Sequence, residues 1–297
     1  MIADTKAMLA QIAKGDGFIA ALDQSGGSTP GALKGYGIPE DRFSSDEEMF
    51  ALIHAMRERV MTSPCFNGEK VIGAILFERT MDGTAGGKPV AELLWERGVV
   101  PFLKVDKGLE EEADGVKLMK PNLGLGKLLD RARGKGIFGT KMRSVIERAN
   151  PAGISAIVAQ QFAVASEINA HGLMPIIEPE VSIKSPDRAE CDRILLAELT
   201  KALDALPAGE RVMLKLTIPV EANMFKPLVD HPAVLKVVAL SGGFSRAEAC
   251  AELARNQGMI ASFSRALLNE LRDEMSDDEF DASLGGAIDE IHAASVA

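Results

Sequence analysis

Charged residues stand near the carboxyl ends of several apolar runs in this sequence, where a buried strand would ordinarily carry aliphatic residues. In three runs they come in pairs two positions apart, so that both members point to the same face of an extended chain. The residues are Asp23, Lys104 with Asp106, Lys141 with Arg143, Glu178 with Glu180, and Lys215. One such charge could equally belong to a structural ion pair. Charges supplied by five runs in corresponding positions favour a shared polar site.

Lys215 has the most apolar flanks of the lysines in this set, because it lies within the stretch VMLKLTIP. In general, a lysine between apolar walls and near other cations has its ammonium form disfavoured. The neutral amine can attack a carbonyl group and form a Schiff base. Lys141 and Arg143 would supply the neighbouring positive charge. Glu178 or Glu180 would supply the proton donor and acceptor. The sequence therefore predicts a site for carbonyl chemistry.

Two segments near the end of the sequence indicate an anion-binding site. Each follows an apolar run and precedes an expected helix, the first of which would begin at an N-cap, Ser245. The residues are Ser241, Gly242 and Gly243 in the first segment, and Ser264 with Arg265 in the second. Glycines let backbone N–H groups approach an anion closely, and a helix N-terminus adds partial positive charge. Either segment could be only a turn, but together they favour a phosphate site.

Eight short apolar runs alternate with longer segments of helical pattern along the sequence. The runs cover residues 17–25, 71–79, 99–108, 136–146, 173–181, 211–219, 234–243 and 259–266. Segments between them, such as 154–172 and 190–206, carry apolar residues every three or four positions, which indicates helices. Strands that alternate with helices pair in parallel, and eight such units favour a closed (β/α)8 barrel over an open doubly wound sheet.

No linker or change in composition divides the sequence, so we expect a single domain of the α/β class, a (β/α)8 TIM barrel, over residues 1–297. One helix is expected at about residues 3–14 and further helices after about residue 265. In such barrels the catalytic groups come from the carboxyl ends of several strands, and loops after the seventh and eighth strands often bind phosphate. The polar residues described above fall at these places.

Composition and charge argue against several kinds of partner. The sequence has 33 Lys and Arg against 43 Asp and Glu, a net charge of −10, which is unlike a protein that binds nucleic acid or an acidic membrane. No run approaches the roughly 20 apolar residues of a membrane span, and no secretory signal is recognisable, so a cytoplasmic protein is expected. The pattern is compatible with a homo-oligomer but does not require one.

Cysteine and histidine spacing predicts neither a disulfide framework nor a metal site. The three cysteines and four histidines are scattered, with no CxxC or HxxxH spacing, so neither a metal nor another cofactor is expected. Two segments resemble nucleotide-binding motifs incompletely. The segment at 82–89 lacks the first glycine of a P-loop, and that at 124–129 lacks the third glycine of a dinucleotide fingerprint. Both are predicted to be turns.

The ordered motifs ALDQSGGS, FLKVDKG, GTKMR, IIEPE, MLKLTIP, LSGG and SFSRA resemble those of class I fructose-bisphosphate aldolases. The resemblance runs from about residue 17 to about residue 270 and is greatest to the shorter bacterial branch. It implies a (β/α)8 barrel that reversibly cleaves fructose 1,6-bisphosphate to dihydroxyacetone phosphate and glyceraldehyde 3-phosphate. It also implies a metal-independent reaction in glycolysis and gluconeogenesis.

The same resemblance implies roles for individual residues. Lys215 matches the lysine that forms the Schiff base, and Glu178 matches the acid and base of carbinolamine chemistry. Asp23 matches the aspartate associated with proton transfer at the C4 hydroxyl. Lys141 matches a second lysine that orients the glutamate, and Glu180 resembles a carboxylate that pairs with this lysine.

Substrate-binding positions follow from the resemblance as well. Those implied for the C1 phosphate are Ser241, Gly242 and Arg265, with Gly243 and Ser264 beside them, and those for the other phosphate are Lys104 and Arg143, with Ser25 and Ser28 nearby. Vertebrate members end in a functional tyrosine, whereas the only tyrosine here is Tyr36. Gln24 stands where those relatives carry glutamate, and Met142 where they carry tryptophan.

Two alternatives to this function stay open at the level of sequence. The first is a Schiff-base aldolase for another phosphorylated ketose, such as tagatose or sedoheptulose bisphosphate. The second is a non-catalytic barrel that binds a phosphosugar, which would have intact phosphate loops but a disrupted set of lysine, glutamate and aspartate. The intact set favours an enzyme.

Overall fold

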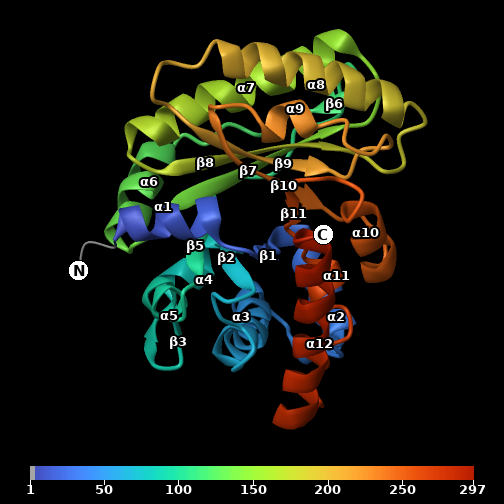
Figure 1. The fold of residues 1–297 in the computed structure, drawn as a ribbon. Helices are drawn as coiled ribbons and strands as arrows, with labels where there is room; N and C mark the ends of the chain where they lie inside the picture. Colours follow the sequence, from blue (N-terminus) through green and yellow to red (C-terminus); the bar gives the residue numbers. More distant parts are fainter. Residues whose placement is uncertain (1–3) are drawn as a thin grey trace.

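All eight apolar runs form strands of one parallel sheet in the computed structural model, which describes residues 4–297 (Figure 1). The strands pair in the order β1-β2-β5-β7-β8-β9-β10-β11. Their bounds are β1 (Phe18–Leu22), β2 (Val71–Leu76), β5 (Val100–Lys104), β7 (Gly139–Ile146), β8 (Met174–Val181), β9 (Val212–Thr217), β10 (Val234–Leu240) and β11 (Met259–Ala261). The Ala21 N–H donates to the Phe263 carbonyl at 3.1 Å, so β11 returns to β1 and nearly closes the sheet. The predicted (β/α)8 barrel is confirmed.

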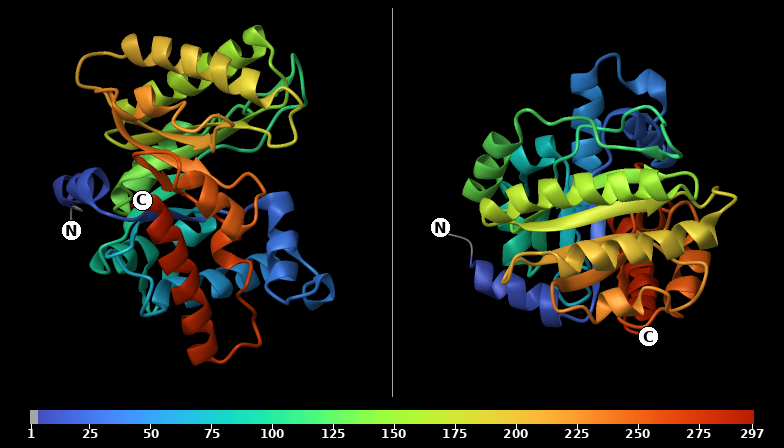
Figure 2. Two further views of the ribbon diagram at one scale, coloured as in Figure 1. Left: turned by 45° about the vertical axis from the view of Figure 1, so that its right-hand side comes forward. Right: turned by 90° about the horizontal axis from the view of Figure 1, so that it is seen from above.

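At least one helix lies between each strand of the barrel and the next, and these helices cover its outside (Figure 2). Their bounds are α1 (Thr5–Lys14), α2 (Thr29–Gly35), α3 (Asp46–Thr62), α4 (Glu78–Asp82), α5 (Val90–Glu96), α6 (Leu125–Gly134), α7 (Pro151–Ala170), α8 (Arg188–Asp204), α9 (Lys226–Val229), α10 (Arg246–Leu253), α11 (Arg265–Leu268) and α12 (Asp277–Ser295). Short elements complete the fold: η1 (Gly26–Ser28), η2 (Glu40–Arg42), β3 (Thr84–Ala85), β4 (Lys88–Pro89) and β6 (Val116–Lys117). The helices predicted at 154–172 and 190–206 are confirmed as α7 and α8, which lie side by side over β8.

The helix predicted at about 3–14 is α1, and its predicted first residue, residue 3, lies outside the described residues. No helix within residues 4–297 combines the length and apolar character that crossing a membrane requires.

The two incomplete nucleotide-binding motifs have different structures. The segment at 82–89 is a hairpin whose turn needs two glycines, since Gly86 and Gly87 have φ of +55° and +76°, so the predicted turn is confirmed. The segment at 124–129 is not a turn but the beginning of α6. Its leucines at helical spacing, Leu125, Leu128 and Leu129, are buried, and this packing makes the segment helical.

Successive side chains along each strand point alternately outward, into an apolar layer, and inward, into the barrel interior. On β9, Val212, Leu214 and Leu216 pack outward with the large core between sheet and helices. Met213 belongs instead to a second cluster, which fills the interior near the amino ends of the strands. Lys215 is the next inward position after Met213, so the interior changes from apolar to charged toward the carboxyl ends.

Helix α1 closes the amino end of the barrel. Met8 and Ile12 are buried in the interior cluster, together with residues at the beginnings of strands such as Ile72 and Val100. Lys236, at the start of β10, donates to the Ala13 carbonyl at the end of the helix at 3.4 Å. The charged interior positions therefore lie at the end of the barrel away from α1.

Helix α8 holds the chain that follows Lys215. Arg188 donates to the Ile218 carbonyl at 2.8 Å, and the carboxylate of Asp192 accepts the Val220 N–H at 3.0 Å. Asp192 is fully buried, and its other oxygen has no partner among the described residues. Burial raises the pKa of Asp192 to about 6, although the Val220 N–H and Arg188 act to lower it.

We expect Asp192→Asn to stabilise the protein at alkaline pH. The folded pKa of Asp192 lies above the unfolded value, so its stabilising contribution is complete below about pH 4 and is lost as pH rises through about 6. Asparagine keeps an acceptor for Val220 without the buried charge. Urea unfolding should give a gain of about 3 kcal/mol at pH 8 and almost none at pH 4. The exposed Asp41→Asn is the control, and an equal gain at both pH values would contradict the argument.

Candidate active site

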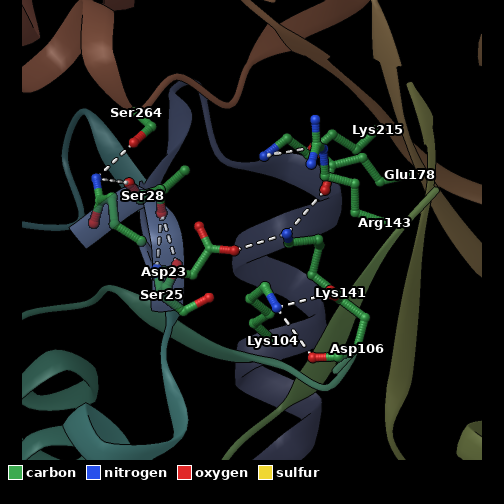
Figure 3. A network of polar contacts seen from close by, with 12 residues as sticks. Asp23, Ser25, Ser28, Lys104, Asp106, Lys141, Arg143, Glu178, Lys215 and Ser264 are labelled. Carbon is green, nitrogen blue, oxygen red and sulfur yellow. Dashed lines mark hydrogen bonds and ion pairs between the residues drawn. The ribbon is translucent and has the colours of Figure 1, made fainter. Parts of the chain in front are cut away.

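The inward charged residues meet in one pocket of about 730 Å³ at the carboxyl ends of the strands (Figure 3). The site residues singled out in the sequence all line it, except Gly243. They are Asp23, Ser25, Ser28, Lys104, Asp106, Lys141, Arg143, Glu178, Glu180, Lys215, Ser241, Gly242, Ser264 and Arg265. Strand register explains the meeting, because Lys104 on β5 is level with Lys141 on β7, and Arg143 is level with Glu178 on β8.

Four of these residues form a continuous chain of ion pairs at the base of the pocket. Lys141 Nζ lies 2.7 Å from Asp23 Oδ2 and 2.9 Å from Glu178 Oε2, so it stands between the two carboxylates (Figure 3). Lys215 Nζ lies 3.3 Å from the other oxygen of Glu178. The side chains of Lys141, Glu178 and Lys215 are each no more than 5% exposed. One carboxylate therefore faces two lysines away from bulk water.

The chain fixes the charge of two of its members. Burial alone would raise the pKa of Asp23, but the positive charges of Lys141 and Lys215 lower it to about 2. Burial likewise acts against the charged form of Lys141, yet Asp23 and Glu178 raise its pKa above the usual range. Asp23 is accordingly a carboxylate and Lys141 an ammonium group at neutral pH.

Glu180 does not pair with Lys141, and that expectation is wrong. Its Oε2 accepts a hydrogen bond from Arg143 Nε at 2.5 Å. Register gives the reason, since Glu180 is level with Val145 on β7, whereas Lys141 is level with Ile176, farther down the barrel. Burial disfavours the charge of Arg143, but the bond to Glu180 raises the pKa of its guanidinium.

Lys104 is held by Asp106, the second charged residue of its run, to which the family resemblance assigned no role. Its ammonium donates to Asp106 Oδ1 at 2.7 Å and to the Asp106 carbonyl at 3.0 Å. The side chain of Asp106 is 4% exposed, and its second oxygen has no partner among residues 4–297. Within the same residues, no three His, Cys, Asp or Glu side chains are grouped as a metal site would need.

The loops after β10 and β11 meet at the rim of the pocket. Gly242 and Gly243 have φ of +59° and +121°, and a Cβ on Gly242 would lie 2.6 Å from the Ile183 side chain, so glycine is required there. Gly243 stands behind the lining, with the guanidinium of Arg265 beside it. Arg265 forms no ion pair within the part of the chain that the structure describes. The predicted N-cap of α10, Ser245, is confirmed and forms a capping box with Glu248.

Ser25 and Ser28 form a small turn in the loop that follows β1. The Ser25 N–H donates to Ser28 Oγ at 3.0 Å, and that hydroxyl donates back to the Ser25 carbonyl at 2.9 Å. The turn places both serines on the pocket wall that follows Asp23.

Gln161 is a site-supporting residue that sequence reasoning missed. It is fully buried on α7, and its Oε1 accepts the backbone N–H of Glu178 at 2.9 Å. The β8–β9 ladder pairs only Ile176 with Met213 and Ile177 with Leu214, so this side chain replaces a strand partner where the ladder stops. The available signal was a glutamine on the apolar face of the helix predicted at 154–172.

Comparisons with known proteins agree with this geometry. The model of the glycolytic class-I fructose-bisphosphate aldolase family matches residues 6–231, which include the whole ion-pair chain. The fructose-bisphosphate aldolase of Plasmodium falciparum is similar over 99% of this chain and 95% of its own, with a TM-score of 0.80 and 22% identity. A Corynebacterium glutamicum (Brevibacterium flavum) protein is similar over 99% and 93%, with a TM-score of 0.58 and 13% identity. At these identities the two structures bear on the fold alone. By the family match, the chain belongs to the class-I fructose-bisphosphate aldolases, which are lyases.

Proposed function

We propose that the protein cleaves fructose 1,6-bisphosphate reversibly through a Schiff base on Lys215. One observation carries the proposal: Lys215 and Lys141 face the same Glu178 carboxylate, at 3.3 and 2.9 Å, and Lys141 also holds Asp23 at 2.7 Å. This arrangement places an amine, an acid–base group and a second carboxylate in one pocket.

Schiff-base formation uses Lys215 and Glu178. The neutral amine of Lys215 attacks the C2 ketone, and the carbinolamine then loses water to give an iminium ion. Glu178 takes a proton from the attacking nitrogen and delivers one to the departing hydroxyl. Lys141 orients the Glu178 carboxylate toward Lys215 through its own contact with the second oxygen.

Carbon–carbon cleavage uses Asp23. The carboxylate accepts the proton of the C4 hydroxyl as the C3–C4 bond breaks, and the bonding electrons pass to the iminium to give an enamine. C4 leaves as the aldehyde carbon of glyceraldehyde 3-phosphate. Protonation of the enamine at C3 and hydrolysis of the resulting iminium release dihydroxyacetone phosphate and restore the Lys215 amine.

Two groups of residues would bind the phosphates. Arg265, with which no carboxylate of residues 4–297 pairs, would bind the C1 phosphate with Ser241, Gly242 and the Ser264 backbone, while Gly243 gives the loop its shape. The other phosphate would contact Lys104 and Arg143, with Ser25 and Ser28 beside them. These two cations are paired with Asp106 and Glu180, so they would share their donors between carboxylate and phosphate.

Glycolysis and gluconeogenesis in the cytoplasm are the setting we propose for this reaction. All three cysteines, Cys65, Cys191 and Cys250, are free thiols, as suits a reducing compartment.

The proposed chemistry needs no metal, so EDTA should leave cleavage intact, and a loss restored by zinc would contradict the proposal.

Borohydride trapping tests the mechanism directly. Reduction in the presence of dihydroxyacetone phosphate converts an iminium into a stable secondary amine, which peptide mapping should place on Lys215. Absence of an adduct would overturn the Schiff-base mechanism and favour a barrel that only binds phosphosugars. Comparing kcat/KM for fructose, tagatose and sedoheptulose bisphosphates then tests the substrate, and we expect fructose 1,6-bisphosphate to be preferred.

A further inference from the structure

Arg57 is a buried cation to which no carboxylate of the described residues is bound. It lies on α3, is 1% exposed, and donates to Thr80 Oγ1 at 2.9 Å, to the Gln24 carbonyl, and to Gln24 Oε1 at 3.3 Å. No carboxylate of residues 4–297 forms an ion pair with it, and its Nε has no partner there. A buried charge without an ion-pair partner is costly. Packing alone therefore does not explain why an arginine is found at this position.

The electrostatic partner of Arg57 is Asp23, which follows β1 immediately before Gln24. Burial lowers the pKa of Arg57 to about 10, and the negative charge of Asp23 acts to raise it. Arg57 therefore stays protonated at neutral pH. It places a fixed positive charge behind the segment that carries the proposed base of the cleavage step.

Gln24 extends the contact across the pocket wall. Its Nε2 donates to Ser264 Oγ at 2.6 Å and to the Ala21 carbonyl at 3.4 Å, while its Oε1 faces Arg57. An arginine can only donate hydrogen bonds, so it fixes which end of the amide faces it. One neutral side chain thus joins the buried cation to the loop next to Arg265.

We propose that Arg57 is a positioning residue, which holds Gln24 so that Asp23 and the Ser264–Arg265 loop act on the same bound substrate. This inference rests on the proposed function, because Asp23 and Arg265 would engage opposite ends of one sugar bisphosphate. Such alignment matters for rate, since a displacement of about 1 Å can cost on the order of 10²-fold.

Two substitutions separate positioning from mere support of the fold. Arg57→Met removes both the charge and the hydrogen bonds, and we expect kcat for fructose 1,6-bisphosphate cleavage to fall about tenfold or more with a raised KM. The acidic limb of its pH–rate profile should move to higher pH, because Asp23 loses a nearby positive charge. Arg57→Lys should restore the limb but only part of kcat. Borohydride trapping of dihydroxyacetone phosphate on Lys215 should persist in both.

Gln24→Leu tests the same connection without touching the buried charge, and it remains informative if the Arg57 variants fail to fold. We expect a raised KM, and no further loss when it is combined with Arg57→Met, since both break one chain of contacts. The matched control is Arg97→Met. Arg97 also donates to backbone carbonyls, of Phe66 and Ser63, but does not line the pocket, so it should lower thermal stability without altering kcat, KM or the pH limb.

The outcomes distinguish this inference from the proposed function. A wild-type protein that forms no adduct with dihydroxyacetone phosphate would overturn the proposed function. A wild type that forms the adduct, with Arg57 and Gln24 variants that lose stability but keep its kcat, KM and pH limb, would overturn the positioning role of Arg57 alone.

Discussion

Replacement of Lys215 by methionine is expected to abolish both cleavage and the borohydride adduct, with kcat reduced by at least about 10⁴-fold. Methionine preserves most of the length of the lysine stem, so packing between Met213 and Thr217 on β9 should survive. Lys141 cannot take over as the nucleophile, because two carboxylates raise its pKa against the opposing effect of burial and keep it protonated.

The measurement combines steady-state cleavage with mass spectrometry of the reduced protein. Lys236→Met is the matched control, because Lys236 is a partly buried lysine on a neighbouring strand, at the end of the barrel closed by α1. It should keep wild-type activity and the adduct. An adduct in Lys215→Met, or activity within about a hundredfold of wild type, would show that Lys215 is not the nucleophile.

The barrel was predictable because its strands and helices carry different periods of hydrophobicity. Buried parallel strands are nearly continuous apolar runs, and every run found in the sequence became a strand. The charged positions were predictable for the same reason, since a lysine such as Lys215 interrupts a pattern that is otherwise uniform. The start of α6 was missed because Gly124 and Gly126 gave the segment the composition of a turn, while its buried leucines decided the structure.

Which charged side chains pair with each other was harder to predict than which residues line the site. The spacing of Lys141, Arg143, Glu178 and Glu180 says which residues share a face, but pairing depends on the stagger between β7 and β8. That stagger sets Glu180 beside Arg143. Gln161 and Arg57 were invisible for a related reason, because each acts through a contact with a residue distant in sequence. A polar residue on an apolar helix face signals a buried partner without identifying it.

Asp23→Asn is expected to stop the reaction after the Schiff base rather than before it. Although burial acts to raise it, the neighbouring lysines lower the pKa of Asp23 to about 2, so the wild-type side chain is an ionised acceptor at neutral pH. Asparagine keeps the shape but cannot accept a proton from the C4 hydroxyl. We expect kcat to fall by about 10²- to 10⁴-fold, while Lys215 and Glu178 still form the iminium.

The mass of the trapped adduct decides where the block lies. When Asp23→Asn is reduced in the presence of fructose 1,6-bisphosphate, the adduct on Lys215 should be the uncleaved hexose bisphosphate, whereas the wild type should yield triose phosphate as well. Asp106→Asn is the comparison, because Asp106 is a pocket carboxylate that binds Lys104 instead of Lys141. It should alter KM and still yield the triose adduct. If Asp23→Asn also yields the triose adduct at near wild-type rates, another group accepts the C4 proton, and the contact between Lys141 and Asp23 serves only to hold the lysine.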